Sequence, residues 1–180
     1  MNITKVNADT LSKARKVTLL ALDVDGVMTD GKIYFSAQGD ELKAFNILDG
    51  QGIKSLLNSN IEIAIITGRT SPLTSRRARD LGINHILQGR EDKRVALQEL
   101  SDELEIPFEA IAYMGDDLPD LSAIIYSGLG VTVPNAHDFV KQHADHCTTL
   151  AGGHGAVREI CDLILASQGL LDKHHEKYLK

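Results

Sequence analysis

In the stretch LLALDVDGVMTDG, residues 19–31, an apolar run ends abruptly in a cluster of acids. The continuous apolar run 17–22 predicts a strand that is buried on both faces. Asp23, Asp25 and Asp30 follow it closely. Carboxylates so near one another repel each other and lose hydration unless a positive charge lies among them. The stretch therefore predicts a buried strand that delivers acids to a cation.

The composition is that of one globular domain spanning residues 1–180, with 43% hydrophobic and 24% charged residues. The absence of Trp and a net charge of −6 argue against a nucleic-acid partner. No run approaches the roughly 20 apolar residues of a membrane span, and the first residues lack the apolar region of a signal peptide. We therefore expect a cytoplasmic protein in which Cys147 and Cys161 are reduced thiols.

Apolar runs alternate with helical patterns along the chain. Further buried strands are expected at 61–66, 110–114 and 129–133, with a weaker one at 84–87; helices are expected over 49–60, 71–82, 91–105 and 118–128. An apolar stripe over 157–165 has helical spacing and predicts a core helix that includes Cys161. This order predicts an α/β, doubly wound, Rossmann-like three-layer sandwich around a parallel sheet. Asp49 is expected as an N-cap, Pro72 in a first turn, and Gly82 and Gly128 at helix ends.

Residues 32–46 interrupt this alternation. They predict a small β-hairpin, turning at Gln38-Gly39-Asp40, that is inserted after the first strand, with Asp30 shaping its entry. No segment is long enough to form a separate cap domain. Residues 168–180, with His174 and His175, are expected to form a C-terminal tail. His143, His146 and Cys147 are expected on the solvated surface.

Polar side chains follow several of the predicted strands, where ligands bind in doubly wound folds. They comprise Asp23 and Asp25, then Thr67, Gly68 and Arg69, then Lys93 at a helix start, and finally Asp116, Asp117 and Asp120. Each motif alone has an ordinary explanation, such as an Asx turn, a helix N-terminus or a solvated lysine. Their joint occurrence at four strand ends favours a single site.

The residue types at these ends suit phosphoryl transfer. Asp23 and Asp116, on different strands, supply the oxygen ligands that Mg²⁺ prefers. Asp23 can also be the nucleophile, because carboxylates form aspartyl-phosphate intermediates. Asp25 is then free to protonate the leaving alkoxide and later to activate water. Thr67 with Gly68, and Lys93, can neutralise the phosphoryl oxygens.

The motifs DVDGVMTDG, ITGR, REDK and GDDLPD, in this order, resemble the four motifs of the haloacid dehalogenase superfamily of aspartate-nucleophile phosphohydrolases. The missing cap, the hairpin and the helix start DGQGI are similar to one subgroup, the 3-deoxy-D-manno-octulosonate 8-phosphate phosphatases. The resemblance implies that Mg²⁺ is held by the Asp23 side chain, the Asp25 carbonyl and Asp116, with Asp117 behind them. It also implies that a phosphorylated sugar acid is bound by Asp25, Asn46, Asp49, Gly50, Lys54, Thr67, Gly68, Arg69, Arg77 and Lys93.

The resemblance thus implies a Mg²⁺-dependent phosphomonoesterase that releases inorganic phosphate from 3-deoxy-D-manno-octulosonate 8-phosphate and feeds lipopolysaccharide assembly. Because a capless site is open to water, we expect a homotetramer in which a neighbouring subunit closes the site. The resemblance implies that the C-terminal tail lies near the site of such a neighbour. A nine-carbon ulosonate 9-phosphate would satisfy the same contacts. From a different functional class, a phospho-aspartate signalling receiver also places acids, a hydroxyl and a lysine on a doubly wound sheet.

Overall fold

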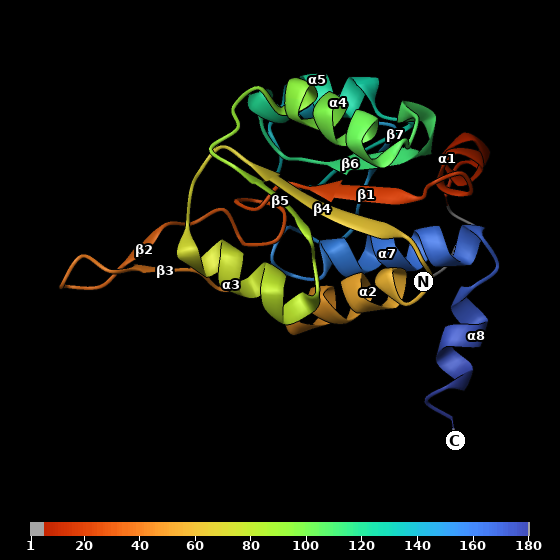
Figure 1. Cartoon of the computed structure of the whole chain (residues 1–180), viewed down its shortest axis with the longest axis horizontal. Helices are drawn as coiled ribbons and strands as arrows, with labels where there is room; N and C mark the ends of the chain where they lie inside the picture. The colour runs from red at the N-terminus through yellow and green to blue at the C-terminus, as the bar shows by residue number, and fades with distance from the viewer. Residues whose placement is uncertain (1–5, 180) are drawn as a thin grey trace.

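The computed structural model describes residues 6–179, and a six-stranded sheet forms its centre (Figure 1). The strand order is β5-β4-β1-β6-β7-β8, and every neighbouring pair is parallel. The strands are β1 (Leu19–Leu22), β4 (Glu62–Thr67), β5 (His85–Gln88), β6 (Ile111–Met114), β7 (Leu129–Thr132) and β8 (His146–Cys147). Strand β1 lies between β4 and β6, so the carboxyl ends of these three strands meet at one edge.

Helices cover both faces of the sheet (Figure 1). One face carries α2 (Ile47–Leu57), α3 (Pro72–Leu81) and α7 (Ala156–Ser167), and the other carries α4 (Lys93–Leu104) and α5 (Leu121–Tyr126). Shorter elements complete the fold: α1 (Ala8–Ala14), the 3₁₀ helices η2 (Phe108–Ala110) and η3 (Leu118–Asp120), α6 (Asp138–Lys141) and α8 (Leu171–Glu176). The predicted doubly wound three-layer sandwich is confirmed.

Strand β1 shows why the sequence has a continuous apolar run there. All four of its residues are buried. Leu20 and Leu22 pack into the core on the side of α7, whereas Leu19 and Ala21 pack into the core on the side of α4. Because successive side chains point to opposite faces and both faces are covered, no position of this strand suits a polar residue.

The predicted hairpin is present and projects from the body of the molecule (Figure 1). Its strands, β2 (Tyr34–Phe35) and β3 (Glu41–Leu42), pair antiparallel. Gly39 has a φ of +89°, a left-handed conformation that glycine adopts without steric cost. At the entry, the carboxylate of Asp30 accepts hydrogen bonds from the Lys32 amide and the Tyr34 hydroxyl. Asp30 therefore shapes the hairpin, as predicted.

Some local expectations are wrong. The N-cap of helix α2 lies three residues earlier than predicted, at Asn46, which accepts a hydrogen bond from the Leu48 amide. Asp49 lies inside the first turn instead. The expected tail contains α8, in which His174 is buried and its Nε2 lies 2.8 Å from Ser59 Oγ. The earlier start of α2 comes from this local cap, whereas the burial of His174 arises from contact with a segment far away in sequence, which local pattern does not report.

No helix within residues 6–179 is both long and apolar enough to cross a bilayer.

Candidate active site

The carboxylate of Asp23 stands at the carboxyl end of β1 with 5% of the residue exposed. Lys93, the first residue of α4, is equally buried and donates from Nζ to Asp23 Oδ1 at 2.8 Å. A buried lysine beside a buried carboxylate removes much of the cost of desolvating each charge. The two residues predicted as nucleophile and phosphate-binding cation thus lie in direct contact.

Asp120 holds Lys93 from the other side, a contact that the sequence did not assign. Lys93 Nζ donates to Asp120 Oδ1 at 2.6 Å, and the buried Tyr113 hydroxyl donates to the same oxygen at 2.7 Å. Asp120 Oδ2 accepts the backbone N–H groups of Asp116 and Asp117, each at 3.2 Å. Asp120 therefore fixes Lys93 and the loop after β6 together. Asp117 and Asp120 form a capping box on η3, and their spacing in GDDLPD was the sequence signal that could have indicated this structural role of Asp120.

Asp116 reaches the site from the end of β6 and passes over Gly26, in the loop after β1. A Cβ atom on Gly26 would lie 2.0 Å from Asp116 Oδ2, and Gly26 has a φ of +102°. Both the conformation and the contact require glycine at this position. The DVDG motif thus supplies an acid at Asp23 and makes room for a second acid from another strand.

The three acids Asp23, Asp116 and Asp120 offer oxygen atoms that all lie within 4.8 Å of one another. Burial, reinforced by repulsion from Asp120, raises the pKa of Asp23 to about 7, against the opposing effect of Lys93. Burial and repulsion from Asp23 and Asp120 raise the pKa of Asp116 to about 7. Burial alone would lower the pKa of Lys93, but the neighbouring carboxylates outweigh it and raise that pKa. The site holds more negative charge than Lys93 balances.

This donor set fits a hard divalent cation. The oxygens of Asp120 are taken by Lys93, Tyr113 and two backbone amides, which leaves Asp23 and Asp116 as the carboxylate ligands. Oxygen donors without imidazole or thiolate suit Mg²⁺, and a cation between the two carboxylates would relieve the repulsion that raises their pKa values. The residues present therefore fit the predicted metal.

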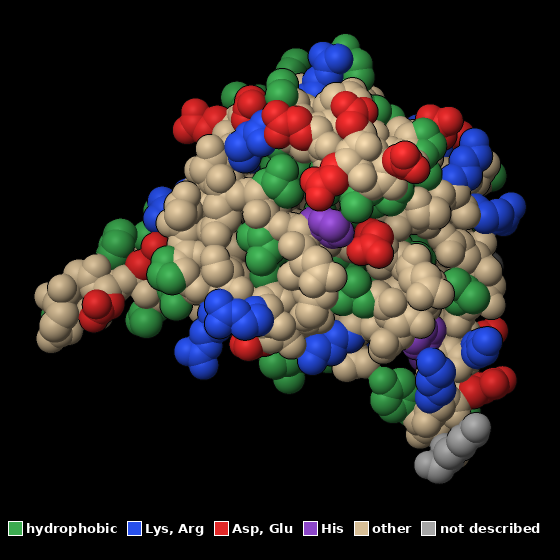
Figure 2. Space-filling model, viewed as in Figure 1, with side chains coloured by type: hydrophobic (Ala, Val, Ile, Leu, Met, Phe, Trp, Pro, Cys, Tyr) green, Lys and Arg blue, Asp and Glu red, His purple; other side chains and the backbone are tan. Residues whose placement is uncertain are grey.

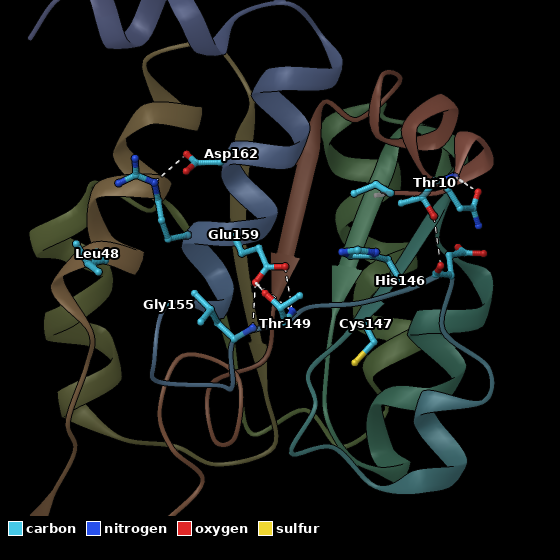
Figure 3. Close-up of a pocket in the computed structure, with 13 residues that line it drawn as sticks. Thr10, Leu48, His146, Cys147, Thr149, Gly155, Glu159 and Asp162 are labelled. Carbon is cyan, nitrogen blue, oxygen red and sulfur yellow. Dashed lines mark hydrogen bonds and ion pairs between the residues drawn. The ribbon is translucent and has the colours of Figure 1, made fainter. Parts of the chain in front are cut away.

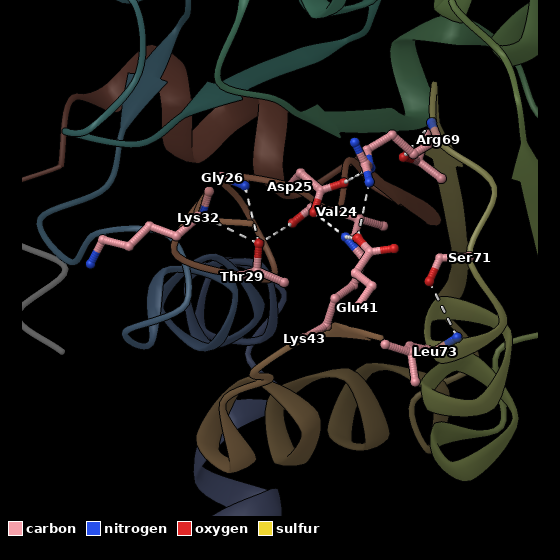
Figure 4. A network of polar contacts seen from close by, with 12 residues as sticks. Val24, Asp25, Gly26, Thr29, Lys32, Glu41, Lys43, Arg69, Ser71 and Leu73 are labelled. Atoms are coloured by element: carbon pink, nitrogen blue, oxygen red, sulfur yellow. Dashed lines mark hydrogen bonds and ion pairs between the residues drawn. The ribbon is translucent and has the colours of Figure 1, made fainter. Parts of the chain in front are cut away.

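The acids open into a cleft of about 730 Å³ at the carboxyl edge of the sheet. Thr67, the last residue of β4, is buried at its wall, and Gly68 and Arg69 continue along it. Figure 4 shows the neighbouring part of this wall, where Arg69 faces Asp25 and the hairpin residues Glu41 and Lys43. The cleft is lined by Asp23, Asp25, Gly31, Thr67, Gly68, Arg69, Glu91, Lys93, Asp116, Asp117, Pro119 and Asp120.

Lys43 is a second residue that sequence reasoning missed. It follows β3 and forms an ion pair with Asp25 Oδ1, while Arg69 Nη2 donates to Glu41 Oε1 at 3.0 Å. Glu41 and Lys43 are two residues apart, so their side chains lie on one face of an extended segment. That alternation was visible in the sequence, but the direction in which the hairpin folds back was not.

Five of the residues expected to face the sugar acid lie outside the cleft lining: Asn46, Asp49, Gly50, Lys54 and Arg77. Asp49 Oδ1 accepts the backbone N–H of Arg158 at 2.8 Å, at the start of α7. Arg77 donates to the Asn46 carbonyl oxygen at 3.0 Å and packs against Gly50, and Lys54 is exposed on α2. Asp117, expected behind the metal ligands, is exposed and caps η3 by accepting the Leu118 amide.

The comparisons with known proteins agree with this geometry. A family model for haloacid dehalogenase-like hydrolases matches residues 81–160. The 3-deoxy-D-manno-octulosonate 8-phosphate phosphatase of Escherichia coli strain K12 is 50% identical over 168 residues, which cover 93% of this chain and 89% of that protein. This chain belongs to that phosphatase family, within the haloacid dehalogenase superfamily.

Solved structures of the phosphatase family have the same fold. The Moraxella catarrhalis phosphatase, in complex with magnesium, phosphate and the sugar acid, matches with a TM-score of 0.93 and 45% identity, covering 94% of this chain and 98% of that one. The cobalt-bound Haemophilus influenzae phosphatase matches with a TM-score of 0.89 and 38% identity, covering 93% and 99%. Membership of a hydrolase family contradicts the alternative of a signalling receiver.

This phosphatase has a second cavity, of about 720 Å³, bordered by α1, β8 and α7 (Figure 3). Its acids already have protein partners: Glu159 accepts from Thr149 and Leu150, and Asp162 accepts from Arg158. His146 also lines it, with a buried Nε2 that has no hydrogen-bond partner among the described residues. The prediction that His146 is solvated is therefore wrong, because β8 joins the sheet and draws it inward.

Proposed function

We propose that this protein is a Mg²⁺-dependent phosphatase that hydrolyses 3-deoxy-D-manno-octulosonate 8-phosphate to 3-deoxy-D-manno-octulosonate and inorganic phosphate. The observation that carries this function is the buried Asp23 carboxylate, held by Lys93 at 2.8 Å and flanked by Asp116, in a member of this phosphatase family.

Asp23 acts as the nucleophile. One of its oxygens forms a bond to the phosphorus while the bond between phosphorus and the sugar oxygen breaks. Asp25 gives a proton to the leaving alkoxide, which departs as the sugar hydroxyl. Lys93, Thr67 and the Gly68 backbone bind the phosphoryl oxygens and balance their charge. The product of this step is an aspartyl phosphate on Asp23.

Hydrolysis of the aspartyl phosphate completes the cycle. Asp25, now deprotonated, takes a proton from a water molecule as that water attacks the phosphorus. The bond between phosphorus and Asp23 breaks, so the carboxylate is restored and inorganic phosphate leaves. One residue thus moves a proton in each direction, and the starting protonation state returns.

Mg²⁺ would be held by the side chains of Asp23 and Asp116 and by the backbone carbonyl of Asp25. It would supply positive charge next to the phosphoryl oxygens. Support for this cofactor comes from the oxygen-only donor set and from the magnesium named in the Moraxella catarrhalis complex.

Substrate selection is assigned to basic and polar residues around the cleft. Arg69 lines the cleft with its side chain 46% exposed, and a guanidinium can bind a sugar carboxylate through two hydrogen bonds. Asn46, Asp49, Gly50, Lys54 and Arg77 remain proposed contacts to the sugar acid. The product would serve lipopolysaccharide biosynthesis, as the sugar acid of this reaction implies.

We further propose that residues 1–180 form one domain that assembles as a homotetramer in the cytoplasm. The exposed apolar side chains of the hairpin support assembly, because water-facing residues there include Ile33, Phe35 (67% exposed) and Leu42 (57%). Figure 2 shows green apolar side chains along this projecting element. Both cysteines are free thiols, which supports a reducing compartment.

A phosphate-release screen over sugar phosphates, with Mg²⁺ and with EDTA, tests this function. The eight-carbon sugar acid phosphate should give the highest kcat/KM, and EDTA should abolish turnover. Asp23→Asn should lose turnover while keeping its melting temperature, since the amide is a poor nucleophile of similar shape. A higher kcat/KM for a nine-carbon ulosonate 9-phosphate would show that this compound is the substrate, and the proposed chemistry would still hold. Retained turnover in Asp23→Asn would refute the mechanism.

A further inference from the structure

Lys43 is a buried lysine that the proposed chemistry leaves without a role. Its side chain is 4% exposed, although it lies just after β3 at the base of the projecting hairpin. Its Nζ forms an ion pair with Asp25 Oδ1 and lies 3.6 Å from Glu41 Oε1. A lysine is buried in this way only where partners compensate its charge, so these contacts determine where its ammonium group lies.

The two oxygens of Asp25 have different surroundings. Oδ1 is held by Lys43, whereas Oδ2 lies 3.8 Å from Arg69 Nε, beyond hydrogen-bonding distance. Arg69 itself is tied to the hairpin through Glu41 at 3.0 Å. Figure 4 shows the four side chains facing one another, two from the hairpin and two from the ends of β1 and β4. One oxygen of Asp25 is therefore held by a direct contact with Lys43, whereas the other lies near Arg69 without a hydrogen bond.

We propose that Lys43 is a positioning residue for Asp25: by holding Oδ1 it orients the carboxyl group so that Oδ2 transfers the proton to the leaving sugar oxygen. The inference rests on the proposed role of Asp25 as general acid and base. Lys43 acts through Asp25 and not on the phosphoryl group, which Lys93 and Thr67 bind. The hairpin thus becomes part of the active site within a single chain, through its base.

This role predicts a dependence on the leaving group. A sugar alkoxide is strongly basic and needs a proton as it departs, whereas 4-nitrophenolate is a weak base and leaves without one. Misplacing the Asp25 carboxyl group therefore slows transfer from the sugar phosphate much more than transfer from 4-nitrophenyl phosphate. A general loss of folding or of phosphate binding would slow both substrates alike.

The test compares kcat/KM for the two esters in wild type, Lys43→Met and Lys43→Arg, with Mg²⁺ present. Lys43→Met should lose about 100-fold on 3-deoxy-D-manno-octulosonate 8-phosphate, at the lower end of what a positioned acid contributes, and less than about threefold on 4-nitrophenyl phosphate. Lys43→Arg should restore part of the loss, because a guanidinium can still hold Oδ1. Asp25→Asn should show the same selectivity, and adding Lys43→Met to it should cause no further loss.

The matched control is Lys32→Met, two residues before β2, the other strand of the hairpin. Lys32 pairs with Asp30 outside the cleft and its side chain is 71% exposed, so both rates should stay within about twofold of wild type. Equal losses on the two esters in Lys43→Met, or an unchanged sugar phosphate rate, would overturn the inference. Should that variant fail to fold, the same comparison on Lys43→Gln decides. A wild type that releases phosphate from neither ester would refute the proposed function itself.

Discussion

Lys93 Nζ and Asp23 Oδ1 lie 2.8 Å apart, although 70 residues separate them in the sequence. The contact forms because β1 occupies the centre of the sheet and α4 begins beside the same edge at which β1 ends. Both groups are buried, so their charges interact with little screening by water. The contact joins the proposed nucleophile to the proposed phosphate-binding cation before any substrate arrives.

Replacing Lys93 by Met should lower kcat by about 10²–10³-fold, since a preorganised donor to the phosphoryl oxygens is lost. Steady-state phosphate release at saturating substrate measures the effect. Lys16→Met is the control, because Lys16 is exposed and precedes β1 at the opposite edge of the sheet. A Lys93→Met protein with activity within about twofold of wild type would contradict the assignment.

Removing Asp120 should affect both stability and rate. Asp120→Ala removes the acceptor of the buried Tyr113 hydroxyl and of two backbone amides, and leaving such donors without a partner costs about 1–3 kcal/mol of unfolding free energy. At temperatures where the variant stays folded, kcat should still fall, because Lys93 loses its orientation. Chemical denaturation and phosphate release measure the two effects.

Tyr113→Phe is the matched control for this variant. It removes one hydrogen bond to Asp120 Oδ1, worth about 1 kcal/mol, and leaves the Lys93 contact at 2.6 Å in place. Its kcat should stay within a few-fold of wild type. Wild-type turnover in Asp120→Ala would show that Asp120 does not orient Lys93.

Asp49 should stabilise the fold, because its carboxylate accepts the Arg158 amide at the N-terminus of α7. Asp49→Ala should lower the unfolding free energy by about 1–2 kcal/mol, the usual cost of losing such a cap. Thermal or urea unfolding measures this, with Asp172→Ala, in an exposed position of α8, as control. An unchanged melting temperature together with a raised KM would instead identify Asp49 purely as a substrate contact.

His146 should make stability depend on pH. Burial lowers its pKa in the folded protein from 6.5, against a smaller opposing effect of Glu159. The folded state therefore binds the proton less readily than the unfolded state, and unfolding free energy is lost as the pH falls below about 6.5. His146→Gln should flatten the decline in melting temperature between about pH 7 and about pH 5.

His143→Gln is the control for this effect, because His143 is exposed on the neighbouring loop. Its melting temperature should decline with pH as in the wild type. An unchanged slope in His146→Gln would show that other groups cause the acid destabilisation.

Sequence alone predicted most of the fold and the principal acids. Buried strands without polar alternation, separated by helical segments, require a covered parallel sheet, and the carboxyl ends of such strands are known binding positions. Asp23 and Thr67 directly follow predicted strands, and Asp116 comes two residues after another, so their convergence could be anticipated. Gly82 likewise ends α3 with a φ of +81°, as its residue type suggested.

Tertiary structure decided the contacts that hold these residues in place. The sequence placed Asp120 among the acids at the strand ends without giving it a partner, and it gave Lys43 no role. Only the packing of η3 and of the hairpin base brings them against Lys93 and Asp25. Asp49 suited a local helix cap, yet it caps α7, more than one hundred residues away in sequence. The local sequence pattern indicates the spacing of hydrophobic residues and the backbone preference of each residue, and both act over only a few residues. The pairing of charged side chains depends on how the helices and strands pack together, and this packing is determined only when the whole chain folds.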